Sequence, residues 1–107
     1  MPDGADKPGR SAPVRDLLGR KWTVEIVAAL LVGARRFSEV RAEVPGLGDT
    51  VLSRRLSELE GAGILSRRQF AEIPPRVVYS LTPAGRSLAS ALAEVERLSI
   101  ASADSAP

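Results

Sequence analysis

Three patterns that follow one another between residues 45 and 82 constrain the fold of this chain more than any other feature. A tight Pro45-Gly46-Leu47 turn comes first, and the run from Thr50 to Ala62 then repeats apolar side chains at helical spacing. Two strand-like runs complete the series, at Ile64–Phe70 and Arg76–Leu81, with the proline-containing segment Ala71–Pro75 between them. A turn, an amphipathic helix and a hairpin in this order predict a winged helix-turn-helix, which is a mostly α fold with a small β-hairpin wing (α+β).

The length of the chain allows one domain. It has 107 residues, 44% of them hydrophobic, which is enough for one core and too little for two. We expect this domain at residues 13–101. The segments 1–12 and 102–107 consist mainly of small and polar residues, and we predict that both are disordered tails.

Composition excludes several kinds of chemistry. The sequence has no cysteine and no histidine, so disulfides, thiolate metal sites and most acid–base catalysis near neutral pH lack their usual side chains. We therefore predict no enzyme activity, no cofactor and no metal. The longest apolar run, Ile26–Val32, is far shorter than the ~20 residues of a membrane helix. Residues 1–13 lack the apolar core of a signal peptide, so we expect a cytoplasmic protein without a membrane partner.

The helical run after the turn has two different faces. Leu52, Leu56 and Leu59 recur at i, i+4 and i+7, so they point to one side. The opposite side is short, hydroxylic and basic, and lacks the long Glu–Lys pairs of a solvated face. In the second helix of a helix-turn-helix such a face meets base edges. We predict base contacts for Thr50, Ser53, Arg54 and Ser57, and the alternative is an ordinary solvated surface.

Further basic and polar residues are candidates for contacts with DNA phosphates. Arg36 precedes a helix that Ser38 is expected to cap, and a helix N-terminus offers free N–H groups to a phosphate. Arg67 and Arg68 are neighbours in a strand, so only one of them is expected to face DNA. The full set of phosphate and wing candidates is Arg36, Ser38, Arg55, Arg67, Arg68 and Arg76. The alternatives are a salt bridge for Arg55 and solvated surface arginines elsewhere.

Several ordered motifs point to one family. They are Gly19-Arg20-Lys21-Trp22-Thr23, Arg36-Phe37-Ser38-Glu39-Val40-Arg41, Pro45-Gly46-Leu47, Val51-Leu52-Ser53-Arg54-Arg55-Leu56-Ser57-Glu58-Leu59, Pro74-Pro75-Arg76-Val77 and Tyr79-Ser80-Leu81-Thr82. Over about residues 13–98 the chain resembles the HxlR-type transcriptional regulators, winged-helix relatives of the multiple-antibiotic-resistance repressors. The resemblance implies a bacterial, homodimeric repressor or activator that binds double-stranded DNA. Two-fold symmetry then predicts an inverted-repeat operator, with helix 49–61 in the major groove and wing 71–75 on the flanking backbone.

The resemblance also implies that two copies meet through the terminal helices. Both helices carry apolar stripes that together exceed what a small domain hides, although the last stripe could instead cover its own domain. The candidate interface residues are Val14, Leu17, Leu18, Leu88, Leu92, Val95 and Leu98. If a small-molecule effector exists, we expect it at this interface near Trp22.

At several positions the chain departs from the family pattern, which limits the family properties that can be expected of it. Ala12 stands where many members resembling this chain have a cysteine, so thiol-based sensing does not carry over. Gly48 replaces the serine that usually starts the recognition helix, and Leu98 replaces a tryptophan near the end of the last helix. Because winged helices also serve as protein–protein interaction modules, a module that does not bind DNA is the alternative function.

Overall fold

The computed structural model describes the backbone of residues 13–104 and the side chains of residues 13–99. The tail predicted at residues 1–12 lies outside the described part, as do residues 105–107. The last helix continues to Asp104, three residues beyond the domain boundary predicted at residue 101. Ala101 and Ala103 favour this extension because alanine has the highest helix propensity.

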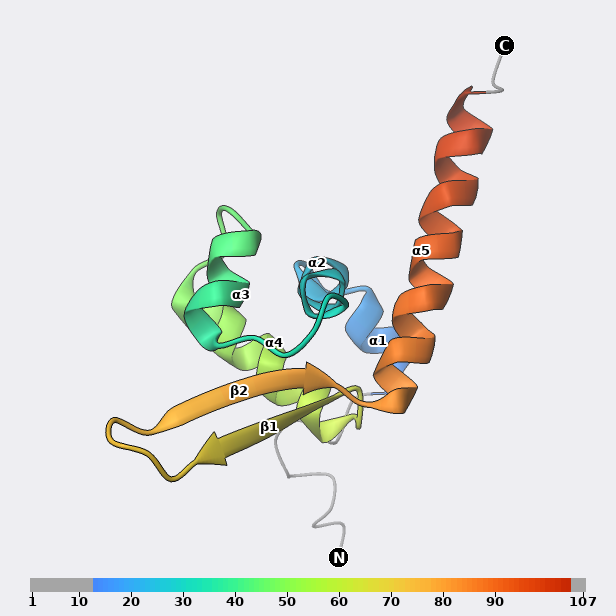
Figure 1. The fold of residues 1–107 in the computed structure, drawn as a ribbon. Coiled ribbons are helices and arrows are strands. Elements are labelled where there is room, and N and C mark those ends of the chain that lie inside the picture. Colours follow the sequence, from blue (N-terminus) through green and yellow to red (C-terminus); the bar gives the residue numbers. More distant parts are fainter. Residues whose placement is uncertain (1–12, 105–107) are drawn as a thin grey trace, which may run out of the picture.

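The described chain folds into five helices and one antiparallel hairpin (Figure 1). The elements are, in chain order, α1 Val14–Leu18, α2 Thr23–Leu30, α3 Phe37–Glu43, α4 Asp49–Gly61, β1 Leu65–Phe70, β2 Arg76–Leu81 and α5 Pro83–Asp104. This order confirms the predicted α+β winged helix-turn-helix. In Figure 1 the hairpin projects to one side of the helical body, and the far half of α5 extends away from the other.

Caps define where the two later helices begin. α4 begins at Asp49, with Gly48 at its N-cap in an extended conformation. α5 begins at Pro83, and the Thr82 hydroxyl accepts a hydrogen bond of 3.0 Å from the Gly85 backbone N–H. The same hydroxyl donates to the Gly63 carbonyl oxygen at 2.6 Å, which ties the start of α5 to the turn that follows α4.

One expectation about the earlier helices is wrong. Ser38 does not cap α3, because that helix already begins at Phe37, and the Glu39 carboxylate accepts the Arg36 backbone N–H at 2.7 Å in place of a serine cap. Trp22 precedes α2 in a left-handed conformation with φ of 80°.

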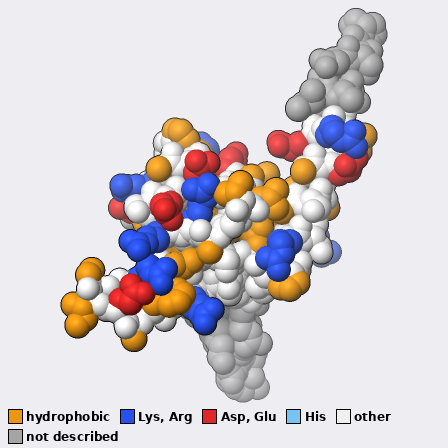
Figure 2. Space-filling model, viewed as in Figure 1, with side chains coloured by type: hydrophobic (Ala, Val, Ile, Leu, Met, Phe, Trp, Pro, Cys, Tyr) orange, Lys and Arg blue, Asp and Glu red, His pale blue; other side chains and the backbone are white. Residues whose placement is uncertain are grey.

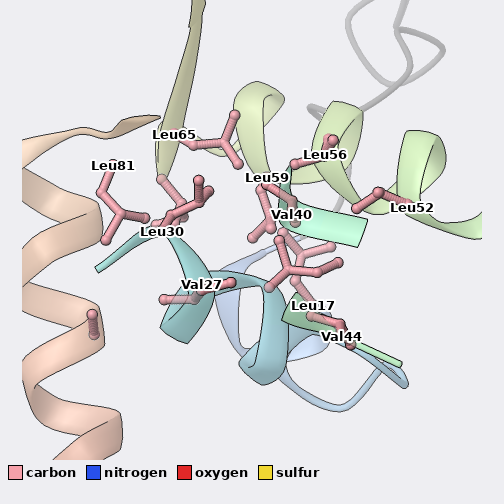
Figure 3. Packing of buried hydrophobic residues seen from close by; sticks show 14 of the residues in the cluster. Leu17, Val27, Leu30, Val40, Val44, Leu52, Leu56, Leu59, Leu65 and Leu81 are labelled. Atoms are coloured by element: carbon pink, nitrogen blue, oxygen red, sulfur yellow. The ribbon is translucent and has the colours of Figure 1, made fainter. Parts of the chain in front are cut away.

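One core holds these elements together. Figure 3 shows leucine and valine side chains of the helices and of the hairpin root pointing into a shared interior. The inward stripe of α4, Leu52, Leu56 and Leu59, is fully buried there, as the helical spacing predicted. Leu65 and Leu81 face each other in the hairpin register and bring the root of the hairpin into the same core.

The hairpin also pairs with the segment between α2 and α3. The Arg35 backbone N–H donates to the Tyr79 carbonyl oxygen at 2.9 Å, and the Tyr79 N–H donates back at 2.8 Å. The Arg35 Nε also donates to the Ala29 carbonyl oxygen near the end of α2 at 2.9 Å. These bonds fix the position of the wing relative to the helices before it.

Candidate nucleic-acid interface

The outward face of α4 presents the four predicted base-edge residues together. Thr50, Ser53, Arg54 and Ser57 are all exposed, and they line an open hollow of about 710 Å³ that Phe37, Asp49 and Glu58 complete. Arg54 forms no ion pair or side-chain hydrogen bond with any residue between 13 and 99. Its five N–H donors are therefore available to an acceptor from outside the chain.

The acids beside this face have basic partners. Asp49 accepts a hydrogen bond from Arg41 at 2.7 Å, across the turn between α3 and α4. Glu58 pairs with both Arg20 and Arg55. Because these pairs neutralise the two carboxylates nearest the hollow, the acids repel a phosphate backbone less than their positions in the sequence suggested.

Arg55 differs from the other phosphate candidates. Its Nε donates to the Lys21 carbonyl oxygen at 2.9 Å, and its Nη1 lies 3.2 Å from Glu58. The side chain is only 14% exposed. The structure thus corrects the phosphate prediction for Arg55 in favour of the salt bridge named as its alternative, which joins α4 to the turn before α2.

Which of Arg67 and Arg68 faces DNA stays a prediction, because neighbours in a strand point to opposite faces, but both side chains are exposed. The physical reason is that the far part of the hairpin stands clear of the helices, so neither of its faces is covered there (Figure 1). The Arg68 guanidinium lies 5.2 Å from the centre of the Phe70 ring.

Arg76 is held by two partners at the far end of the hairpin. Its guanidinium lies 4.0 Å from the centre of the Phe70 ring and donates from Nη2 to Glu72 at 2.8 Å and from Nε at 3.2 Å. These hydrogen bonds, helped by the charges of Arg76 and Arg36, hold the pKa of Glu72 below its ordinary value of 4.5. The same hydrogen bonds raise the pKa of Arg76, so both groups are charged at neutral pH.

Arg36 and Ser38 are exposed at the start of α3. Arg36 lies near enough to the wing for its charge to act on Glu72. Sequence reasoning missed Arg35 and Glu72, which position the wing. The alternating pattern of β2 predicted a strand, but no signal in the sequence indicated that Arg35 would pair with it.

The predicted interface residues of the terminal helices fall into three groups. Leu17 is buried in the core of the chain itself, so its assignment to a dimer interface is corrected. Val14, Leu18, Leu88 and Leu92 are half-buried. Val95 and Leu98 are 57% and 60% exposed, and they continue the apolar stripe along the part of α5 that extends from the body.

A second open hollow lies at Trp22, where the sequence placed any effector. It measures about 420 Å³ and is bounded by Trp22, Glu25, Ala28, Ala29, Glu43, Val44 and Pro45. The effector stays a prediction. Within residues 13–99, no group of three or more acidic side chains is arranged to hold a metal ion, and no helix among the described residues is long and apolar enough to cross a membrane.

Comparison with known proteins supplies the family. The family model described as HxlR-like helix-turn-helix matches residues 17–105. The chain is 45% identical over 82 residues to YvaP of Bacillus subtilis, an uncharacterised HTH-type transcriptional regulator, and the alignment covers 77% of this chain and 76% of YvaP. It is 35% identical over 80 residues to the HTH-type transcriptional regulator YodB of the same organism, with 75% of this chain and 71% of YodB covered.

Solved structures agree with this result. The crystal structure of diamide-treated YodB from B. subtilis matches with a TM-score of 0.72 at 33% identity, covering 78% of this chain and 83% of YodB. The redox regulator HypR in its reduced form matches with a TM-score of 0.77 at 32% identity, covering 85% of this chain and 90% of HypR. The chain therefore belongs to the HxlR-like helix-turn-helix family of transcriptional regulators.

Proposed function

We propose that this regulator binds an inverted-repeat DNA operator as a homodimer, with α4 of each protomer in the major groove and the hairpin along the flanking backbone. One observation carries the proposal: the exposed hydroxyl groups and the Arg54 guanidinium lie together on the side of α4 opposite its buried leucines. A helix held in this way can enter the groove without moving from the core. Two-fold symmetry predicts half-sites about one helical turn apart.

Arg54 is proposed to read a base directly, because its forked guanidinium matches the two major-groove acceptors of guanine. Thr50, Ser53 and Ser57 would serve neighbouring bases or phosphates. Arg36, Ser38, Arg76 and one of the pair Arg67 and Arg68 are proposed to contact the backbone, which fixes the register of the protein on the duplex.

The test begins by selecting, from a pool of random DNA duplexes, those that the wild-type protein binds at a stated salt concentration. Arg54→Ala should then weaken binding to the selected duplex by about 1–3 kcal/mol and relax the preference at one base position. Arg97→Ala is the matched control, because Arg97 is exposed on α5 far along the chain from α4. Unchanged affinity and footprint for Arg54→Ala would refute the assignment of α4.

The homodimer is proposed to form through the exposed part of the α5 stripe together with the half-buried residues of α1 and α5. Leu98→Glu should convert dimers to monomers in analytical ultracentrifugation, because it places a charge in a desolvated contact. The core should be unaffected, since Leu98 is largely exposed in the protomer. Ser90→Glu, also exposed on α5, should sediment like the wild type. An intact Leu98→Glu dimer would contradict this interface.

The alternative is a protein–protein interaction module on the same fold. The formal net charge of only +2 favours it, since non-specific attraction to DNA grows with basic charge. It predicts that the wild-type protein retards no duplex in a gel shift, even at low salt. That result would refute the proposed DNA binding and favour the protein–protein interaction module.

A further inference from the structure

The far end of the hairpin contains a small cluster that is separate from the buried core. Phe70, at the end of β1, carries the Arg76 guanidinium on its ring face, and Glu72 accepts hydrogen bonds from the Nε and Nη2 of the same guanidinium. All three side chains lie on the projecting part of the wing, where Figure 2 shows charged and hydrophobic side chains gathered beside one another.

Phe70 and Glu72 occupy one face and one edge of the Arg76 guanidinium and leave a second edge without a partner among residues 13–99. One flat face lies on the Phe70 ring, and the edge formed by Nε and Nη2 is occupied by the Glu72 carboxylate. An arginine has a second edge, formed by Nη1 and Nη2, that can donate two parallel hydrogen bonds. Within residues 13–99, no hydrogen bond or ion pair of Arg76 uses Nη1.

Phe70 and Glu72 therefore restrict the movement of the Arg76 guanidinium, while its Nη1–Nη2 edge can still donate two hydrogen bonds. An unrestrained arginine loses side-chain entropy when it binds, and it can follow any phosphate nearby. A guanidinium that is already fixed on two sides loses less side-chain entropy on binding than an unrestrained one. It also favours a pair of acceptors that lies in one particular orientation. The negative charge of Glu72 also reduces the attraction of this arginine for phosphates in general.

We propose that Glu72 is a positioning residue that makes Arg76 a specificity-determining contact of the wing, by holding one edge and leaving the other for a paired acceptor on DNA. This inference rests on the proposed DNA-binding function. It assigns to the wing a part in sequence discrimination, beyond a general contact with the flanking backbone.

The test measures the ratio of affinities for the selected duplex and a random duplex, at several salt concentrations. Glu72→Ala should raise affinity for the random duplex and lower the ratio about five- to tenfold, the lower range for losing a bidentate contact. The salt dependence should steepen by about one unit, because the loss of the Glu72 charge adds one net positive charge to the surface that meets the phosphates. Glu72→Gln, which keeps one acceptor atom, should lower the ratio less.

Two comparisons separate positioning from other effects. In an Arg76→Ala background, Glu72→Ala should leave the ratio unchanged, because the residue through which Glu72 acts is gone. The control Glu94→Ala removes a similar ion pair with Arg97 on α5 and should not change the ratio. Thermal unfolding should be the same for all these variants, since the substituted carboxylates are exposed.

The inference is overturned if Glu72→Ala leaves the ratio unchanged, or if it changes the ratio equally with and without Arg76. Either result is distinct from failure of the proposed function, which would appear as a wild-type protein that retards no duplex. A second measurement needs no DNA: the Arg76 Nε–H resonance should exchange with solvent more slowly in the wild type than in Glu72→Ala. Equal exchange rates would also overturn the inference.

Discussion

α4 and the hairpin both carry exposed arginines, yet the two elements are held in place by different forces. α4 is fixed along its length by three fully buried leucines. The hairpin enters the core at its root through Leu65 and Leu81, and Tyr79 packs against the same core. At the far end of the hairpin, Arg76 instead makes surface contacts with Phe70 and Glu72. The position of Arg54 thus depends on hydrophobic burial, and the position of Arg76 on charge.

This difference has consequences for how the two elements respond to solution conditions. Hydrophobic burial is insensitive to moderate salt and to pH, whereas an exposed ion pair is screened by salt and lost when its carboxylate is protonated. We therefore expect the far half of the wing to loosen under conditions that leave α4 in place. Three experiments test this contrast.

The largest effect is expected for the core under α4. Leu56→Ala should lower the free energy of unfolding by about 2–5 kcal/mol, because it removes buried methyl and methylene groups and leaves a cavity. Ile73→Ala is the matched control at the tip of the wing, where the side chain is 102% exposed, and its effect should lie within about 0.5 kcal/mol of zero. Urea denaturation measures both. Similar losses for the two variants would contradict the contrast.

A smaller loss is expected at the root of the hairpin, where α5 packs closely on the segment after α4. A Cβ added at Gly85 would lie 1.9 Å from the Ile64 carbonyl oxygen, so the backbone would have to shift. Gly85→Ser should lower the free energy of unfolding by about 1–3 kcal/mol, in the range of overpacked sites.

The control for this prediction makes the same change in open space. A Cβ at Gly48 meets no atom within 4 Å, and serine is a better N-cap than glycine. Gly48→Ser should therefore leave the stability unchanged or raise it by a few tenths of a kcal/mol. If urea denaturation shows no larger loss of stability for Gly85→Ser than for Gly48→Ser, the close packing of Gly85 on the Ile64 carbonyl oxygen is wrong.

The smallest effect is the pH dependence of the wing. The pKa of Glu72 is lowered in the folded protein, chiefly by hydrogen bonds from Arg76. Its contribution is therefore fully present above the ordinary value of 4.5 and is lost as the pH falls through the lower, folded value. NMR titration of the Glu72 carboxyl carbon should show a midpoint below 4.5 that rises in Arg76→Ala. A wild-type midpoint at or above 4.5 would contradict the Glu72–Arg76 ion pair.

Much of the fold could be predicted because its signals are local. The leucine spacing predicted the two faces of α4, and the Pro45-Gly46-Leu47 turn predicted the break before it. Errors arose where a contact joins segments distant in the chain. Leu17 was assigned to an interface because its stripe shows that it is apolar but not which surface buries it. Arg55 was assigned to phosphate because its partner, the Lys21 carbonyl, lies 34 positions away.

By itself, the sequence determined the order of helices and strands, the inward stripe of α4 and the absence of thiol and imidazole chemistry, because periodicity and composition are properties of the chain alone. Only the tertiary structure decided which of the described arginines form ion pairs or hydrogen bonds within the chain and which remain exposed without them. Arg54 and Arg55 are neighbours in sequence, yet one is exposed and the other is bonded to Lys21 and Glu58. The reason is that ion pairs and close backbone approaches depend on how elements pack against one another, which residue spacing does not encode.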